Sequence, residues 1–262
     1  MKPARFLPPA SDEPADEHEI KLRIEPRSQL APVVERIEAL AAEDGNAAHD
    51  TLSAEIGDAF GLDDIAGIKG IGHVERFMVY HDTRALDLYR CDASLRTRRR
   101  RNGKCRVNAK RSGKGDGSHG VAVRREWRYT LAPDVYDFLE RARFRPLALH
   151  HFADLLGRRG DARLGLSPVV QIQKCSTRIE LCGAGGERFL LSLDRFRGFD
   201  CRTPEIGGTT GELREVELEA LNGKATRELG SICDHMSLPP GVEQGRPKYQ
   251  LLVEELGIES GS

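Results

Sequence analysis

The sequence predicts an α+β protein in which antiparallel strands outnumber helices. Segments with alternating apolar and polar residues follow one another in hairpin-like succession, which is typical of antiparallel pairing. Helical spacing of apolar residues is confined to a few segments. With 262 residues, of which 39% are hydrophobic, the chain is long enough to bury one large core.

The first elements are an arm, a strand and a helix. Residues 1–16 are rich in Pro, Ala and acidic residues, which is typical of a flexible arm. Residues 17–24 alternate as a strand does. Apolar spacing predicts a helix within 28–44, with Ser28 as its cap. The sequence does not assign the next segment, 46–71, to one element.

Further strands and two helices are predicted after this segment. The helices are 132–144, which begins at Pro133, and 223–236. The predicted strands are 72–80, 93–101, 104–111, 122–131, 168–181, 187–195, 197–203 and 211–220. Neither a repeat nor a linker divides the chain, so we expect a single folded domain.

Composition and charge argue against several classes of protein. The net charge is only −1, which is unlike a protein whose whole surface attracts nucleic acid, although residues 96–128 are strongly basic. No apolar run approaches the ~20 residues that span a bilayer, and the N-terminus lacks a signal peptide, so we expect a cytoplasmic protein without membrane contact. The six cysteines form no CxxC pair, which indicates neither a zinc site nor a disulfide framework.

The predicted strands carry charge on one face. In 17–24, Glu17, Glu19, Lys21 and Arg23 lie on one face, while the other is mostly apolar. The same parity recurs in later strands and aligns Arg96 with Arg98, Arg106 with Lys110, Arg124 with Glu126 and Arg128, Lys174 with Arg178 and Glu180, and Glu215 with Glu217 and Glu219; Asp194 lies between apolar neighbours.

Two architectures accommodate these charged faces. A conventional sheet leaves them in water, at little cost. A barrel with its charged faces turned inward encloses them, which costs several kcal/mol per ion unless each charge finds a partner. Carboxylates and cations together would then suit a metal-bound polyanion such as a chain of phosphates.

Ordered motifs resemble the CYTH family, the triphosphate tunnel metalloenzymes, and in particular its bacterial inorganic triphosphatases. "EHEIKL" resembles the ExExK motif, "YHDTRALDLYRCDASLRTRRR" the YxDT…LRxRR stretch, and "VNAKRSG" the strand that ends in lysine. "RRE", "LDRFRG" and "REVELEALNGK" follow in family order, and "PKYQLL" takes the place of the last lysine. The resemblance spans residues 17 to 252.

The resemblance implies an eight-stranded antiparallel β tunnel barrel with a polar interior, flanked by helices. The tunnel domain would cover 17–256 and be followed by a tail at 257–262. Residues 46–71 would be an insertion, because the family usually has a shorter segment between its first helix and second strand.

The resemblance also assigns roles to residues. Metal ions, Mg²⁺ or Mn²⁺, would bind to carboxylates, namely Glu17, Glu19, Asp194, Glu215, Glu217 and Glu219. Phosphate oxygens would be bound by cations, namely Lys21, Arg96, Arg98, Lys110, Arg124, Lys174, Arg178 and Lys248. Glu126 would belong to the same substrate site and orient a cation or a second metal. Glu19 and Lys21 would be the catalytic residues.

The implied activity is metal-dependent hydrolysis of a phosphoanhydride in inorganic triphosphate or a related triphosphorylated small molecule, with no side-chain nucleophile. Rival activities are a class IV adenylate cyclase and a thiamine triphosphatase, although Trp127 falls on the outward face of its strand. A non-catalytic binder of polyphosphate or nucleic-acid ends would not need the full set of carboxylates. The sequence leaves open which triphosphate is preferred and whether the chain forms a homodimer.

Two features suggest other readings. "AGIKGIG", at 66–72, looks like the hairpin of a helix-hairpin-helix module, but a strand follows it at once, so we do not expect DNA binding. His150 and His151 adjoin an apolar stretch, which favours a surface or core role over metal ligation.

Overall fold

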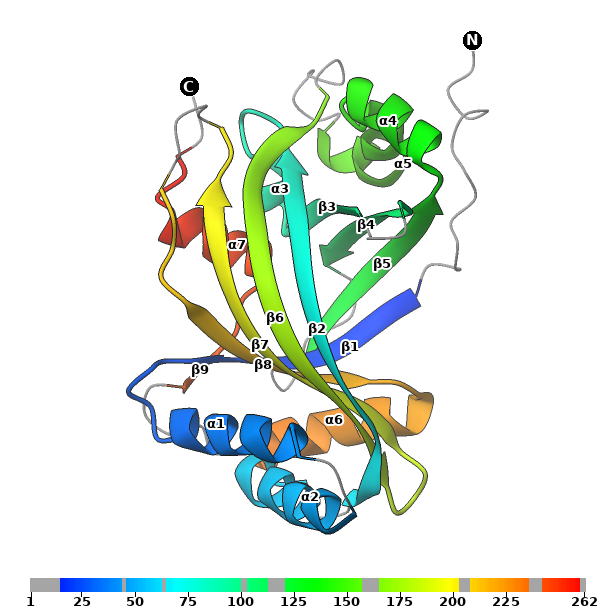
Figure 1. Cartoon of the computed structure of the whole chain (residues 1–262). Helices are drawn as coiled ribbons and strands as arrows, with labels where there is room; N and C mark the ends of the chain where they lie inside the picture. Colours follow the sequence, from blue (N-terminus) through cyan, green and yellow to red (C-terminus); the bar gives the residue numbers. More distant parts are fainter. Residues whose placement is uncertain are drawn as a thin grey trace.

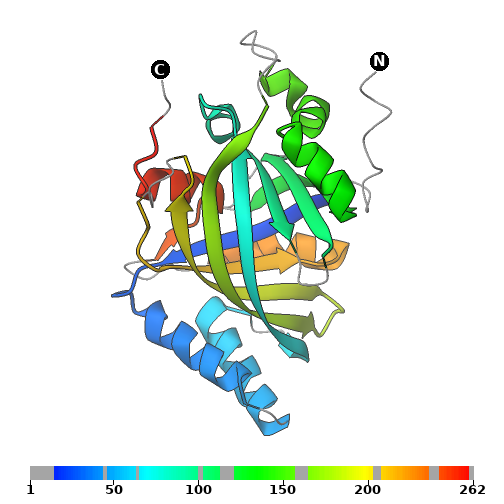
Figure 2. The same cartoon turned by 45° about the horizontal axis from the view of Figure 1, so that its top comes forward.

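Eight antiparallel strands close into a ring (Figures 1 and 2). The computed structural model describes residues 15–43, 46–62, 65–99, 103–112, 121–156, 165–202, 208–235 and 242–259. The strands are β1 (Ala15–Ile24), β2 (Ile65–Asp82), β3 (Ala93–Arg99), β4 (Cys105–Ser112), β5 (Ala122–Leu131), β6 (Ser167–Gly183), β7 (Arg188–Asp200) and β8 (Leu213–Ala220). They follow one another round the ring in the order β1-β5-β4-β3-β2-β6-β7-β8. The predicted α+β fold with an eight-stranded antiparallel tunnel is confirmed.

The first strand closes the ring. β1 pairs with β8 through Glu19–Arg23 and with β5 through Ala15–Glu19, so it joins the two ends of the sheet. The short strand β9 (Val242–Gln244) continues beside the end of β1, where β5 no longer pairs. Successive side chains of a strand point to opposite faces of the sheet. When the ring closes, every second side chain of each strand therefore points into the tunnel.

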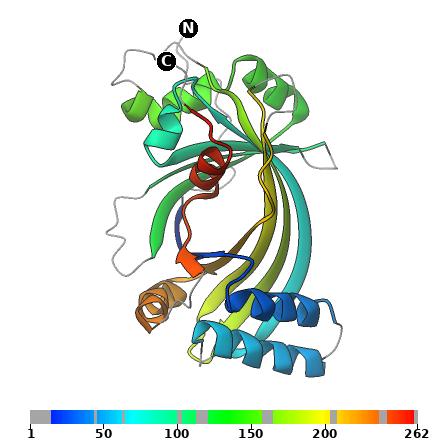
Figure 3. The same ribbon diagram turned by 90° about the vertical axis from the view of Figure 1, so that its left-hand side faces the viewer.

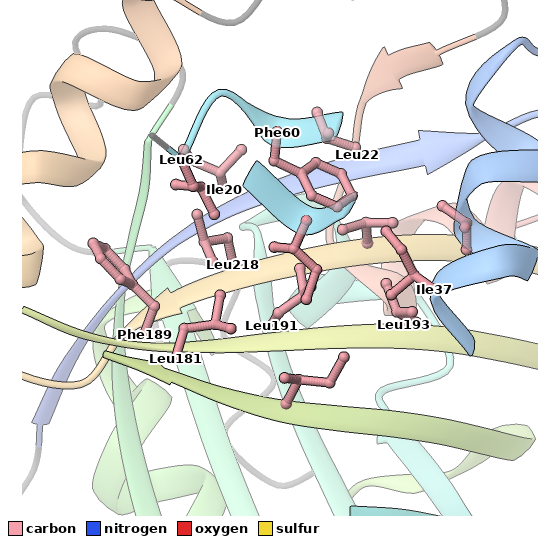
Figure 4. Packing of buried hydrophobic residues seen from close by; sticks show 14 of the residues in the cluster. Ile20, Leu22, Ile37, Phe60, Leu62, Leu181, Phe189, Leu191, Leu193 and Leu218 are labelled. Carbon is pink, nitrogen blue, oxygen red and sulfur yellow. The ribbon is translucent and has the colours of Figure 1, made fainter. Parts of the chain in front are cut away.

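Helices cover the apolar outer face at one side of the ring. α1 (Leu30–Ala41), α2 (Asn46–Phe60) and α6 (Gly223–His235) lie below the strands in Figure 1. Their apolar faces share one buried cluster with β1, β6, β7 and β8. Figure 4 shows Ile20 and Leu22 of β1 within this cluster, together with Ile37 of α1 and Phe60 of α2. The alternation of β1 therefore places its apolar row outside and its charged row inside.

A second helical layer covers β3, β4 and β5. It consists of α4 (Pro133–Arg141), which has Pro133 in its first turn as predicted, and α5 (Arg145–Leu156). Leu139, Leu147 and Phe152 from this layer are fully buried against residues such as Leu95 and Val107. The outer faces of these strands are thereby removed from water as well.

One end of the tunnel is filled by α7 (Lys248–Glu255), next to the short helix α3 (Asp87–Arg90). Tyr249, Leu251 and Leu252 share a buried cluster with Ile172 and Phe196 of the ring. These two ring residues continue the rows of Lys174 and Asp194, which face inward, so the helix packs against inner strand faces. Figure 3 views the molecule from the side on which α7 lies.

Several predicted boundaries are wrong, for identifiable reasons. β2 begins at Ile65 instead of 72, because register shifts near Gly67 and Gly70 admit "AGIKGIG" into a strand paired with β6. β7 is one strand from 188 to 200 instead of two. Gly198 lies inside β7, where a Cβ would be 2.5 Å from Leu252, so this glycine reflects close packing of α7.

Other predictions concern the ends of elements. Ser28 was predicted to cap α1, but the residue at the cap position is Gln29. The hydroxyl of Ser28 has no hydrogen-bond partner among the described residues, so the prediction is wrong. Residues 46–71, predicted as an insertion, contain α2 and the start of β2. The predicted arm lies outside the described residues, apart from 15 and 16, which begin β1. Within the described residues, no helix is both long and apolar enough to cross a membrane.

Candidate functional site

The ring encloses a cavity of about 260 Å³ with charged walls. Every strand of the ring contributes to its lining, together with the first residues of α7. Most of the predicted site residues line it, namely Glu17, Glu19, Lys21, Arg96, Lys110, Arg124, Glu126, Lys174, Arg178, Glu217, Glu219 and Lys248. The inward arrangement of the charged faces, one of the two alternatives left by the sequence, is therefore the one observed.

Three predicted residues lie beside this cavity. Asp194 and Glu215 are buried behind Lys248, with 2% and 1% of their surface exposed. Arg98 lines a smaller adjoining cavity of about 40 Å³, which it shares with Arg76 and Arg106. Asp194 and Glu215 contact Lys248, which lines the cavity, and Arg98 lies beside Arg76 and Arg106, which line both cavities.

Charge is divided between two walls of the cavity. The register sets Glu19 opposite Glu219 and Lys21 opposite Glu217, on β1 and β8. The same ladder continues to β7, where Asp194 faces Glu215. The carboxylates are thus concentrated on β1, β7 and β8, whereas the arginines Arg76, Arg96, Arg106 and Arg178 line the cavity from β2, β3, β4 and β6.

Lysines neutralise much of the acidic wall. The Nζ atom of Lys248 lies 2.9 Å from Asp194 Oδ2 and 2.6 Å from Glu217 Oε1, and also pairs with Glu215. Lys174 pairs with Asp194 from the neighbouring strand β6. Burial opposes the charge of Lys248, but Asp194 and the two glutamates outweigh it and raise the pKa of this lysine well above its ordinary value.

Lys21 lies between two carboxylates of adjacent strands. Its Nζ atom is 2.9 Å from Glu19 Oε1 and 3.0 Å from Glu217 Oε1. Burial lowers the pKa of Lys21, but these two carboxylates raise it further, so the ammonium stays charged. Arg124 approaches the same oxygen of Glu19, at 3.7 Å.

The acidic wall has the chemistry of a site for a hard divalent cation. Asp194, Glu215 and Glu217 offer carboxylate oxygens within 4.8 Å of one another. In the described part of the chain, Asp194 Oδ1 and Glu215 Oε1 are buried without a hydrogen-bond partner. Unpaired carboxylate oxygens are suitable ligands for magnesium or manganese ions. The residues therefore fit the metal that the sequence predicts.

A second carboxylate group faces the open part of the cavity. Burial, together with the nearby charges of Glu17 and Glu19, raises the pKa of Glu219 to about 7. Glu17 pairs with Lys110 and lies 3.3 Å from Arg128 Nη2. Burial is the main cause of this raised pKa, and the two neighbouring carboxylates add to it.

Glu126 holds cations of the basic wall in place. Its carboxylate accepts hydrogen bonds from Asn108 Nδ2 at 2.5 Å and from Arg128 Nε at 2.6 Å. Arg96 Nη2 lies 3.6 Å away. Burial would raise the pKa of Glu126, but Lys110 and Arg96 lower it strongly, so the group stays ionised.

Reasoning from the sequence missed several residues that line the cavity. Arg106 and Arg128 share the inward parity of their strands but were not assigned to the site. Arg76 lies four residues before Tyr80 on β2, so the two side chains point to the same face of the strand. This shared face is the signal that could have identified Arg76. Burial and the cations Arg178, Arg98 and Arg96 lower the pKa of Arg76 to about 10.

Trp127 and the two histidines lie outside the tunnel. Trp127 packs against the cluster under α4 and α5, as its outward parity predicted. His151 is buried, and its Nε2 atom is 2.6 Å from the hydroxyl of Tyr129, whereas His150 is exposed. These surface and core positions agree with the prediction.

Comparisons with known proteins give one family match. Residues 63–232 match the CYTH domain family. A solved structure described as a putative adenylyl cyclase from Hippeastrum with a dominant triphosphatase activity shares 18% identity and covers 94% of this chain and 91% of its own, with a TM-score of 0.45. The hypothetical protein NE1496 shares 14% identity over 92% of this chain and 97% of its own, with a TM-score of 0.28. No curated protein matches the chain.

Proposed function

Because the chain belongs to the CYTH family, which matches more than half of its length, we propose that it hydrolyses a phosphoanhydride bond of inorganic triphosphate or a related triphosphorylated compound, with Mg²⁺ or Mn²⁺. One observation carries this proposal. The acidic wall, with the carboxylates of β1, β7 and β8, faces the basic wall, with the arginines of β2, β3, β4 and β6, across one cavity of about 260 Å³. A polyanion alone would be repelled by the first wall, and a cation alone by the second.

We assign the metal ligands to the acidic wall. They are Glu17, Glu19, Glu217 and Glu219, with Asp194 and Glu215 behind them. When bound, the divalent cation neutralises phosphate oxygens and makes a coordinated water more acidic. Asp194 and Glu215 also hold Lys248 in position through their ion pairs.

The cations of the cavity bind and orient the phosphates. Lys21, Lys110 and Arg124 lie next to the carboxylates, where they can contact the phosphoryl group under attack. Arg96 and Arg178 contact the remaining phosphates from the other wall, and Arg98 supports them from the adjoining cavity. Glu126 fixes the guanidinium groups of Arg96 and Arg128. Fixed charges of this kind stabilise the charge that develops on a transferred phosphoryl group without reorganising water.

Substrate preference follows from what the lining lacks. Among its described residues, only Leu190, Leu221 and Pro247 are aliphatic, and the aromatic rings of Tyr80 and Tyr249 are stacked on each other, 5.0 Å apart. The lining therefore offers little to a nucleobase, which favours inorganic triphosphate as the substrate.

Identifying the products tests the proposal. The protein is incubated with tripolyphosphate, ATP or thiamine triphosphate in Mg²⁺ or Mn²⁺. We expect orthophosphate from tripolyphosphate as the fastest reaction. Cyclic AMP with pyrophosphate from ATP, or no turnover of any triphosphate, would contradict it.

A pair of variants tests the site. Glu19→Gln removes one charge from the acidic wall, and we expect turnover to fall at least ~100-fold, as for the loss of other fixed charges in active sites. Its control is Glu75→Gln, on the exposed outer face of β2, which should leave turnover within about twofold. Both variants should unfold at nearly the wild-type denaturant concentration. Full metal-dependent activity in Glu19→Gln would refute the assignment.

A further inference from the structure

Outside the tunnel, a groove of about 360 Å³ lies between the β4–β5 hairpin and α5. Its described lining consists of Arg111, Arg125, Trp127, His150, His151 and Ala153. This lining combines two guanidinium groups with an indole and two imidazoles, and it contains no carboxylate. The tunnel chemistry uses none of these residues.

The aromatic part of the groove is held rigidly. The ring of His151 lies 4.6 Å from that of Trp127, and its Nε2 atom is fixed by the hydroxyl of Tyr129 at 2.6 Å. Burial, with His150 and Arg111 nearby, lowers the pKa of His151 to about 4. His151 is therefore neutral at pH 7 and supports the indole, while the arginines supply positive charge.

The cationic part is held more loosely. Arg125 is exposed, and its guanidinium carbon lies 5.9 Å from the centre of the Trp127 ring. This distance is near the ~6 Å limit for a cation–π contact, so the guanidinium can turn toward an anion at small cost. Arg111 donates to the carbonyl of His151 at 3.4 Å, which places a second guanidinium at the edge of the groove.

We propose that this groove is a second ligand site, which binds a nucleotide with its base against Trp127 and its phosphate between Arg111 and Arg125. Planar bases stack on aromatic side chains and on guanidinium groups, and arginine matches the geometry of a phosphate. A small inorganic anion would use only the arginines, and an uncharged nucleoside only the rings.

The only tryptophan in the chain reports on this site directly. AMP is titrated into the full-length protein while the fluorescence of Trp127 is followed, with calorimetry as a second measure of binding. We expect saturable quenching by AMP, and binding at least tenfold weaker for adenosine and for inorganic phosphate. Equal affinity for AMP and phosphate, or no binding of AMP by either method, would overturn the proposal.

Two variants locate the binding. Arg125→Gln should weaken AMP binding at least tenfold and leave triphosphate turnover within twofold, because Arg125 is exposed outside the tunnel. Glu19→Gln should leave AMP binding unchanged, which separates this groove from the cavity of the ring. Undiminished binding in Arg125→Gln, or loss of binding in Glu19→Gln, would show that AMP binds elsewhere, whatever the outcome for triphosphate hydrolysis.

Discussion

Arg76 lies among other cations, which suits phosphate binding but lowers the stability of the fold. No carboxylate forms an ion pair with it in the described part of the chain, and burial with three neighbouring arginines lowers its pKa to about 10. Its Nε atom is buried without a hydrogen-bond partner among the described residues. A half-buried cation in this state is costly without an anion, so we infer that Arg76 binds a phosphate of the substrate.

Arg76→Gln separates these two effects. We expect the KM for tripolyphosphate to rise roughly tenfold, which corresponds to about 1.4 kcal/mol of lost binding. The free energy of unfolding without substrate should not fall, because a repelled charge has been removed. Steady-state kinetics and urea unfolding measure both quantities. Arg197→Gln, on the exposed outer face of β7, is the control and should change neither.

His81 makes stability depend on pH. Burial lowers its pKa from 6.5 to about 4, while the unfolded chain still takes up a proton near pH 6.5. Below pH 6.5 the unfolded state binds more protons, so the stability that His81 contributes is present above this pH and is lost as pH falls toward 4. At pH 5 the loss is about 2 kcal/mol. Burial raises the pKa of Asp82 from 3.8 to about 6. Between these two values the folded state binds more protons than the unfolded chain, so the contribution of Asp82 to stability grows as pH falls.

The contribution of His81 is isolated by comparing variants. Urea unfolding of the wild type at pH 7 and pH 5 gives a difference in stability, and His81→Asn should reduce that difference by about 2 kcal/mol. The exposed His150→Asn variant should keep the wild-type difference. An unchanged pH dependence in His81→Asn would show that this imidazole is not held neutral by the fold.

Among the elements, the strands of the tunnel were the most predictable. Alternation identified β1, β5 and β8 and the inward rows that carry Glu19, Arg124 and Glu217, because a period of two fixes the face of every residue once the strand is recognised. Closure into a ring depends on pairing between β1 and β5, which lie about a hundred residues apart, so no local pattern reveals it. The resemblance to a known family supplied that part of the prediction.

The glycines and α7 were less predictable because their roles are set by tertiary contacts. Gly67 and Gly198 look like breaks in a strand, yet one accompanies a bulge and the other makes room for Leu252. Lys248 was placed in the site only through the resemblance. Its helix shows no strand parity that would turn it toward the carboxylates.

Tyr249 anchors α7 to the ring, and we predict that this anchor positions Lys248. The hydroxyl of Tyr249 donates to Asp82 Oδ2 at 2.8 Å, and Asp82 also accepts from the amides of Leu88 and Tyr89, both at 2.9 Å. Tyr249→Phe removes one oxygen and leaves a buried acceptor with one donor fewer. The expected cost is about 1–3 kcal/mol, with a fall in kcat that exceeds any change in KM because Lys248 shifts.

Tyr89→Phe is the matched control for this anchor. The hydroxyl of Tyr89 reaches Glu254 on the same helix, but at 3.4 Å and in an exposed position. Its loss should change stability by less than about 0.5 kcal/mol and leave kcat unaltered. If both phenylalanine variants behave alike, the buried hydrogen bond to Asp82 does not position the helix.

At the scale of the whole molecule, charge is separated into two walls, so like charges on each wall repel one another. Burial, together with Glu17 and Glu19 of β1, raises the pKa of Glu219 to about 7, and burial with three arginines of neighbouring strands lowers that of Arg76. Ligands that neutralise either wall bind the folded state alone, because the unfolded chain does not gather these groups. The molecule should therefore be stabilised by the ions that it binds.

Thermal unfolding with and without ions tests this linkage. Mg²⁺ together with a slowly hydrolysed triphosphate analogue should raise the Tm, with a gain of about 2.7 kcal/mol at a ligand concentration a hundred times its Kd. NaCl at the same ionic strength should produce a smaller shift, since it only screens the charges. Equal shifts from both additions would indicate screening without a specific site.

Among the described residues, α7 closes one end of the enclosed chamber, so we expect substrate to enter at the other end. Arg128 lines the chamber and keeps 40% of its side chain exposed, whereas the opposite end is packed with Tyr249, Leu251 and Leu252. A long phosphate polymer therefore cannot thread through, and only its terminus can reach the carboxylates. We therefore expect products to leave by the route through which the next substrate arrives, and accumulated orthophosphate or pyrophosphate to slow its entry.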